Sequence, residues 1–111
     1  MSMVHYCIVR DDLPRGVLAA QLIHAAGESS PGDLPSGTRA VALAARDEAQ
    51  LLAIEARLRF EDIPHHAIRE PSAPWSGALM AIGLAPVPRC STPLRALKQL
   101  SLLIEHQEKR P

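Results

Sequence analysis

Two polar side chains in an otherwise apolar segment are the first candidates for chemistry. Gln21 and His24 lie within residues 15–27, a stretch in which most other positions are Leu, Ile, Val or Ala. Residues three apart share a face of an α-helix, so one face would carry both side chains, with Val17 one turn earlier. Such a pair is either satisfied inside the core or forms the wall of a pocket near the strand ends, where open α/β sheets usually bind ligands.

A carboxylate and a tryptophan flank a turn-rich segment later in the chain. Glu70 ends an expected strand and is followed by residues 71–76 (PSAPWS), which include Trp75. A carboxylate at a strand end beside a loop is a candidate general base or water-orienting group, and the alternative is a solvated turn residue. Trp75 either covers the hydrophobic core or offers a stacking surface for a nucleic-acid base.

The residue spacing does not favour a metal site or a phosphate-binding loop. His65 and His66 are neighbours on an expected strand, so their side chains point to opposite faces of the sheet. No Cys or carboxylate stands beside them at metal-ligand spacing. The sequence also contains no glycine-rich phosphate loop and no G-x-S-x-G elbow. We therefore expect no metal and no cofactor.

The composition limits the classes of function. The 111 residues suffice for one domain (1–111), with a core over about residues 3–104 and a charged tail over 105–111, and 47% of them are apolar. Twelve basic residues balance twelve acidic ones. The chain thus lacks the general basic character of many nucleic-acid-binding proteins, although zero net charge is compatible with a local basic patch.

The cysteines and the apolar runs bear on the cellular compartment. Cys7 and Cys90 are the only cysteines, and the sequence does not open with a charged segment followed by a long apolar run. The longest apolar runs fall well short of the roughly 18–20 residues that span a membrane. We expect reduced thiols, a cytoplasmic protein and no membrane association.

The hydrophobic pattern predicts an α/β protein with the element order β-α-β-α-β-β-α. Its architecture would be a three-layer α/β/α sandwich around a mixed four-stranded sheet. The link between the last two strands is too short for a parallel crossover, so these strands should be antiparallel if they are neighbours. The expected elements are strand 3–9, helix 15–27, strand 38–44, helix 47–59 with Asp47 and Gln50 in a capping box, strands 65–69 and 77–84, and helix 92–104.

Motifs along the chain resemble the type-2 peptidyl-tRNA hydrolase family. The most specific is residues 19–26 (AAQLIHAA), which resemble the A-A-Q-x-x-H-A-A helix of that family. The resemblance extends over about residues 3–103. The other stretches that carry it are residues 6–13 (YCIVRDDL), 39–52 (RAVALAARDEAQLL), 68–70 (IRE), and 81–83 (AIG) with Pro86.

The resemblance implies a function and a set of site residues. Members of the family hydrolyse the ester that links a peptide to the 3′ end of tRNA; they need no metal, and many are homodimers. Carried over to this chain, the resemblance implies a homodimeric enzyme acting on peptidyl-tRNA. Glu70 and His24 would be catalytic, and the substrate would be held by Asp12, Arg15, Gln21 and Trp75.

The chain departs from the family pattern at a central position. The family has a G-K-G-K run before A-A-Q, and the second lysine is a proposed catalytic residue, whereas residues 14–17 here read PRGV. Val17 therefore stands at the lysine position and can neither bind phosphate nor move a proton. Arg15 keeps a positive charge nearby, but its pKa above about 12 makes it a poor acid or base.

Further departures lie around the third and fourth strands. Glu70 replaces the aspartate of the family, residues 71–76 replace a longer loop, and Ala78 stands where the family has a threonine. The sequence is therefore compatible with two functions. One is a peptidyl-tRNA hydrolase, and the other is a family member that has lost catalysis and serves as an RNA- or protein-binding module.

Overall fold

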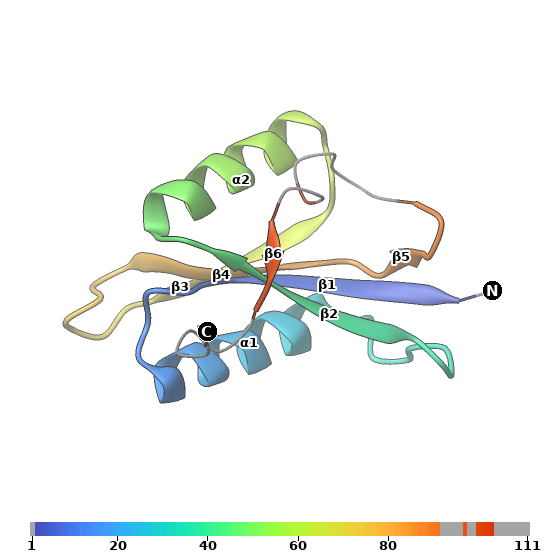
Figure 1. Ribbon diagram of the computed structural model, residues 1–111, viewed down its shortest axis with the longest axis horizontal. Coiled ribbons are helices and arrows are strands. Elements are labelled where there is room, and N and C mark those ends of the chain that lie inside the picture. Colours follow the sequence, from blue (N-terminus) through green and yellow to red (C-terminus); the bar gives the residue numbers. More distant parts are fainter. Residues whose placement is uncertain (1, 92–96, 98–99, 104–111) are drawn as a thin grey trace, which may run out of the picture.

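Two helices lie on opposite faces of one mixed β-sheet (Figure 1) in the computed structural model, which describes residues 2–91, 97 and 100–103. This arrangement confirms the predicted α/β class. The elements are β1 (Met3–Arg10), α1 (Arg15–Ser29), β2 (Arg39–Ala45), α2 (Glu48–Phe60), β3 (His65–Glu70), β4 (Ala78–Leu84), β5 (Val87–Pro88) and β6 (Ser101–Leu102).

Three strands have their carboxyl ends on the same side of the sheet. Its strand order is β3-β4-β1-β2-β6, and β5 pairs with the beginning of β1. β1 and β2 are parallel, while β4 is antiparallel to both β1 and β3, as predicted for the hairpin. The carboxyl ends of β1, β2 and β3 therefore point the same way, and α1 and α2 begin just after two of them.

The expected sheet of four strands is wrong, because the described residues form a sheet of six. Ser101 and Leu102, which lie inside the predicted helix 92–104, form β6 and pair with Ala44 and Leu43 on the edge of β2. A short leucine-rich run fits either a buried helix or a strand, and here pairing satisfies backbone groups of both segments. Apart from residues 97 and 100–103, the predicted helix 92–104 lies outside the described residues.

The other unpredicted strand, β5, holds only two residues. Pro88 lies opposite Met3, and Val87 lies opposite Val4. Proline cannot donate a hydrogen bond to a strand ladder, so the sequence indicated only that the preceding strand stops. A two-residue pairing at the margin of a sheet tolerates proline because only one side of the strand is bonded.

Helix α1 continues two residues beyond Gly27, its predicted end, and is held against the sheet by Ser29. The Ser29 hydroxyl donates to the carbonyl of Ala25 at 2.6 Å and accepts from Nε2 of the buried His5 at 2.7 Å. Burial lowers the pKa of His5, which favours the neutral ring. Gly83 on β4 makes the close approach possible, since a Cβ there would overlap Ser29 and the Ala25 carbonyl.

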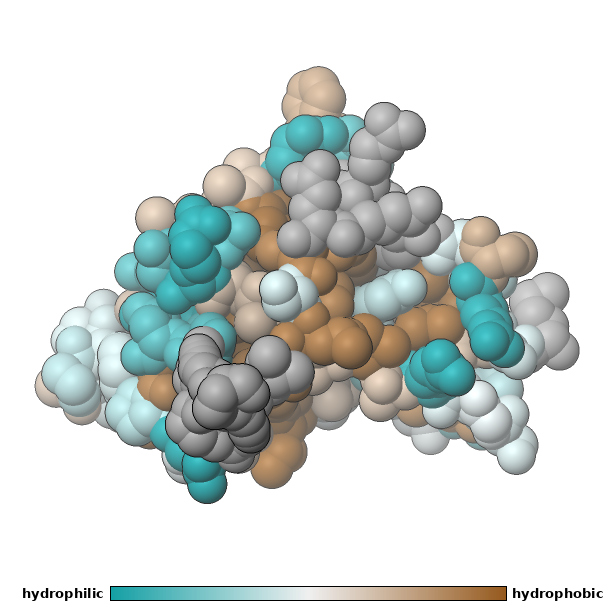
Figure 2. Space-filling model, in the orientation of Figure 1, coloured by the Kyte–Doolittle hydropathy of each residue, from teal (hydrophilic) through white to brown (hydrophobic). Residues whose placement is uncertain are grey.

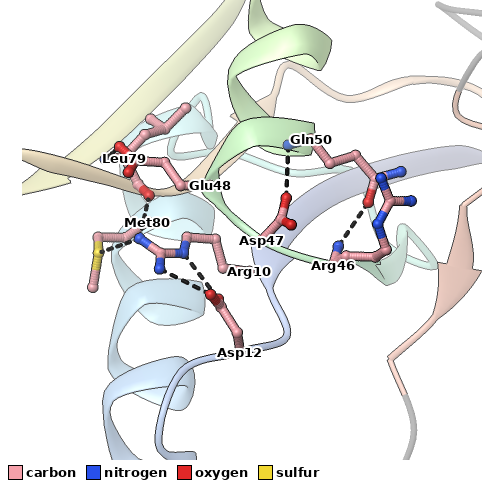
Figure 3. Close-up of polar contacts among 8 residues, drawn as sticks. All are labelled: Arg10, Asp12, Arg46, Asp47, Glu48, Gln50, Leu79 and Met80. Atoms are coloured by element: carbon pink, nitrogen blue, oxygen red, sulfur yellow. Dashed lines mark hydrogen bonds and ion pairs between the residues drawn. The ribbon is translucent and has the colours of Figure 1, made fainter.

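A side-chain cap fixes the start of α2, as predicted. The Asp47 carboxylate accepts from the backbone N–H of Gln50 at 2.9 Å, and the Gln50 side chain accepts from the backbone N–H of Arg46 at 2.6 Å (Figure 3). This arrangement satisfies free donors at the helix start and places Glu48, in its first turn, beside β4.

The hydrophobic core is divided between the two faces of the sheet. On one face α2 contributes Leu51, Ile54 and Leu58, which pack against side chains such as Ile8 and Ile82. The core on the α1 side includes Cys7, Val9, Leu13, Ala25, Ile68, Met80 and Ala81. Figure 2 shows apolar side chains gathered across the middle of the face on which β2 lies between the two helices. Among the described residues, no helix is both long and apolar enough to span a membrane.

Candidate functional site

A cleft of about 310 Å³ lies between α1 and the edge strand β3. Helix α1 contributes the polar side chains, and β3 with its following residue forms the opposite wall. The cleft reaches the carboxyl end of β3, the position at which open α/β sheets usually bind ligands. Its lining residues are Gln21, His24, Glu28, Ala67, Ile68, Arg69, Glu70 and Pro71.

Gln21 joins the two walls of this cleft. The residue is 4% exposed, and its Nε2 donates to Oε1 of Glu70 at 3.2 Å. Because the amide nitrogen faces a carboxylate, the orientation of the amide group is fixed, and Oε1 of Gln21 is left buried without a hydrogen-bond partner among the described residues. An unpaired buried acceptor of this kind typically costs about 1–3 kcal/mol.

Glu70 is held from two directions. Its Oε2 accepts from the backbone N–H of Ser72 at 3.1 Å, and its Oε1 accepts from Gln21. The pKa of Glu70 is lowered, first by the backbone N–H of Ser72, then by the Ser72 hydroxyl and the Gln21 amide, with a smaller effect from His24. The carboxylate is therefore ionised at neutral pH and suits orienting a water or binding a cation better than donating a proton.

His24 lies one turn beyond Gln21 and lines the same cleft, with its ring exposed to solvent. The two side chains do not form the satisfied core pair that the sequence left open. Gln21 is buried but bonds a side chain across the cleft rather than a neighbouring carbonyl. Gln21, His24 and Glu70, three of the six residues proposed from the sequence, are therefore brought together.

A second polar group, which we call the Arg10 network, lies at the carboxyl end of β1. It consists of Arg10, Asp12, Glu48, the backbone of Leu79, and the sulfur of Met80 (Figure 3). Arg10 is 8% exposed and donates from Nε and Nη2 to the two carboxylate oxygens of Asp12, at 2.9 and 3.0 Å. This bidentate pair lowers the pKa of Asp12 and raises that of Arg10.

An irregularity in β4 explains why the network exists. The β3–β4 register pairs Ile68 with Ala81 but Arg69 with Leu79, so Met80 is an extra residue in β4. The β1–β4 ladder ends at Ala81, and the backbone of Leu79 bonds side chains instead. Its N–H donates to Glu48 at 2.9 Å, and its carbonyl accepts from Nη1 of Arg10 at 3.2 Å.

Sequence reasoning did not select Arg10 or Glu48. The available signal was the position of Arg10 at the end of an apolar strand that should be covered on both faces. An arginine there is buried only if its charge finds partners. The partners include a backbone group exposed by the β4 irregularity, and such an irregularity has no clear signature in a single sequence.

The remaining residues proposed from the sequence do not line the cleft. Asp12 bonds Arg10, and the half-buried Trp75 packs into the α1-side core with its ring centre 5.7 Å from the Arg10 guanidinium carbon. Trp75 thus serves as core cover. Arg15 is exposed in the first turn of α1, while Val17 is partly buried against the same core.

The histidine pair and the other titratable groups do not form a metal centre. Within the part of the chain that the structure describes, no three His, Cys, Asp or Glu side chains are grouped so that they could hold an ion. His65 bonds the Ile63 carbonyl at 2.8 Å through Nδ1, whereas His66 is exposed.

No family model matches the sequence, and a search of curated proteins returns no significant match.

Proposed function

We propose that this chain is a peptidyl-tRNA hydrolase that cleaves the ester between a peptide and the 3′ end of tRNA. The observation that carries the proposal is the ionised carboxylate of Glu70, which is fixed by Ser72 and Gln21 in an open cleft that also contains His24. The resemblance of residues 19–26 to the A-A-Q-x-x-H-A-A helix supports the same assignment.

The roles of the residues follow from their positions. Glu70 orients the attacking water and accepts its proton, although its lowered pKa makes it a weak base. His24, at the exposed side of the cleft, contacts the reacting ester. Arg15 in the first turn of α1 meets a tRNA phosphate, since helix N-termini also favour anions. We further propose a cytoplasmic homodimer.

The second candidate is a binding module without catalysis, and the observation that favours it is Val17. A valine side chain has no polar or ionisable atom, so it can neither bind a phosphate nor transfer a proton. Here it is partly buried against the α1-side core. A protein of this kind would bind RNA or a protein partner through the same region. RNA binding would show the salt dependence expected of phosphate contacts.

Release of the peptide from N-acetyl-aminoacyl-tRNA by purified protein separates the two candidates. The hydrolase is expected to lose about 10²-fold in rate in Glu70→Gln and in His24→Ala, as is typical when a positioned acid–base group is removed. Asp33→Asn, which changes an exposed carboxylate in the loop before β2, is the matched control and should leave the rate unchanged.

Two results would count against the hydrolase. Full activity in both Glu70→Gln and His24→Ala would remove their assigned roles. Absence of release by the unaltered protein, together with tRNA binding that weakens steeply with salt, would establish the binding module instead.

A further inference from the structure

Strand β3 lies at the edge of the sheet, and no strand of the described residues pairs with its outer side. On the inner side, the carbonyls of Pro64 and Glu70 accept from N–H groups just beyond the two ends of β4. Bonding positions alternate along an antiparallel pair, and the extra residue at Met80 lies in β4, so the even-numbered residues of β3 face β4. The backbone N–H and C=O groups of Ala67 and Arg69 therefore point outward.

The cleft follows this outward-facing backbone. Its lining includes Ala67, Ile68 and Arg69 in succession. The side chain of Ala67 packs on the α2 side of the sheet, and that of Arg69 contacts Glu55 of α2 at 3.5 Å. The cleft at these two residues is therefore formed largely by backbone. An extended peptide can add to a sheet edge through such groups, and neighbouring pockets then recognise its alternate side chains.

We propose that the cleft binds an extended peptide as an added strand on the outer side of β3, beside α1. One residue of the peptide, placed between Ala67 and Arg69, donates its N–H to the Ala67 carbonyl and accepts from the Arg69 N–H. Every second residue of the peptide faces β3 in this way, and the backbone groups of the residues between point away from the protein.

The inference rests on the proposed function in taking this peptide as the acyl part of peptidyl-tRNA. The ester of that substrate is at the carboxyl end of the peptide, and Glu70 is at the carboxyl end of β3. The ester therefore reaches Glu70 only if the peptide runs parallel to β3. The strand advances about 3.3 Å per residue, so roughly four peptide residues before the ester lie along Ala67 to Glu70.

The helix wall sets a preference for the charge of the peptide. Helix α1 returns toward the beginning of β1 (Figure 1), so it runs opposite to β3, from Gln21 beside Glu70 to Glu28. This part of α1 advances about 10 Å at ~1.5 Å per residue, which places the exposed Glu28 level with Ala67. A basic side chain directed toward α1 is therefore favoured over an acidic one.

Titration of isotope-labelled protein with short acetylated peptide amides, followed by amide NMR, tests the added strand. A pentapeptide of alternating alanine and lysine should bind with a Kd of about 1 mM. At saturation it should slow hydrogen exchange of the outward amides of Ala67 and Arg69 but not of Ile68, which faces β4. A peptide with glutamate in place of lysine should bind about threefold or more weakly.

N-methylation of the probe distinguishes an added strand from other modes of contact. Each methyl group removes one backbone N–H and blocks the approach to β3. Methylation should weaken binding about tenfold at alternate positions of the peptide and by less than about twofold at the positions between.

Variants of the protein locate the peptide. Ala67→Pro removes an outward N–H without removing a bond to β4, a change that edge strands tolerate, and should weaken peptide binding about tenfold. Glu28→Lys should reverse the charge preference, so that the glutamate peptide binds more tightly than the lysine peptide. Glu28 is exposed, so this variant stays informative if Ala67→Pro does not fold. The control Asp33→Asn should bind both peptides like the unaltered protein.

Several outcomes would overturn the proposal. These are no binding at about 10 mM peptide, equal weakening by N-methylation at every position, and a charge preference that Glu28→Lys does not change. A dimer that Ala67→Pro dissociates, without peptide binding, would assign this edge to a second copy of the chain instead.

The site and the hydrolase can fail separately. Peptide binding without release of peptide from tRNA would keep this site and remove the hydrolase. Release at a rate independent of peptide length up to about four residues, without binding of the free peptides, would keep the hydrolase and remove this site.

Discussion

The Arg10 network lies at the carboxyl end of β1, and the cleft of Gln21 reaches the carboxyl end of β3. The two places differ in how their hydrogen bonds are satisfied. In the network, the buried guanidinium of Arg10 bonds both oxygens of Asp12 and the Leu79 carbonyl. In the cleft, the buried amide of Gln21 makes one long bond, and its oxygen has no partner in the part of the chain that the structure describes. Both places hold a carboxylate with a lowered pKa.

The comparison shows that a charged group with a shifted pKa does not by itself mark a site. Asp12 and Glu70 are both ionised and both bonded, but Asp12 completes a closed network that joins β1 to β4. Glu70 borders an open cleft, and its partner Gln21 has a buried oxygen without a hydrogen-bond partner among the described residues. Structural ion pairs and functional groups perturb pKa values alike, so the unsatisfied partner is the more informative observation.

The largest effect should come from removing the centre of the network. Arg10→Met keeps an apolar chain of similar length but removes the donors to Asp12 and to the Leu79 carbonyl. Loss of a buried charged partner leaves these acceptors unpaired, and we expect the free energy of unfolding to fall by about 3 kcal/mol. Unfolding in urea, followed by circular dichroism, measures this change.

The control for this prediction is Arg57→Met, which removes an exposed arginine of α2 that pairs with Glu61, the residue after the helix. Exposed pairs of this kind contribute about 0.5 kcal/mol. If Arg10→Met cost no more than Arg57→Met, the network would not hold β1 and β4 together, and the contrast with the cleft would disappear.

A smaller effect is expected from Asp12 and should depend on pH. Its folded pKa lies below the ordinary value of about 3.9, so the ion pair stabilises the fold above that pH and is lost as the pH falls through the folded pKa. Because its side chain is 39% exposed, we expect Asp12→Asn to lower the free energy of unfolding at pH 7 by only about 1 kcal/mol.

The difference between Asp12→Asn and the unaltered protein should shrink as the pH falls below about 4, where the ion pair is itself lost. Urea unfolding at a series of pH values measures it. Glu70→Gln should show the same direction with a smaller amplitude, since Glu70 lies at the open cleft. A difference that stays constant down to acid pH would mean that the charge of Asp12 does not stabilise the fold.

The sequence predicted the features that depend on residues close together in the chain. Spacing placed Gln21 and His24 on one helical face, and the capping pattern of Asp47 and Gln50 fixed the start of α2. The pairing of Gln21 with Glu70 joins residues 49 positions apart, and periodicity carries no information about such a contact. The same holds for Arg10, whose burial depends on an extra residue in β4 at Met80.

The sequence interpretation was wrong where a segment pairs with the edge of the sheet. Ser101 and Leu102 lie in a segment that has the composition of a helix, but these two residues pair with the open side of β2. Which segment completes a sheet edge is set by the whole fold rather than by the segment. For Trp75 the sequence allowed core cover or base stacking, and the contact with Arg10 and the α1-side core, which selects core cover, depends on residues distant in the chain.

The smallest change in stability should come from Gln21→Met, which tests the cleft rather than the Arg10 network. Methionine has a similar length, and the substitution removes both the long bond to Glu70 and the buried oxygen that has no partner among the described residues. Since the lost bond and the removed penalty are of similar size, we expect the free energy of unfolding to change by less than about 0.5 kcal/mol. A clear gain in stability would also fit a site whose polarity is kept for function.

Urea unfolding and the tRNA-ester assay on the same preparation provide the measurements. Unchanged stability with at least about tenfold slower hydrolysis would show that Gln21 orients Glu70 rather than supporting the fold, because the carboxylate would keep only its contact with Ser72. Gln21→Glu is the companion variant, since a second carboxylate beside Glu70 should raise the pKa of the pair and move the acid limb of the rate profile upward. A loss of stability in Gln21→Met as large as that in Arg10→Met would instead make the amide a structural bridge between α1 and β3, and the two regions would then be alike.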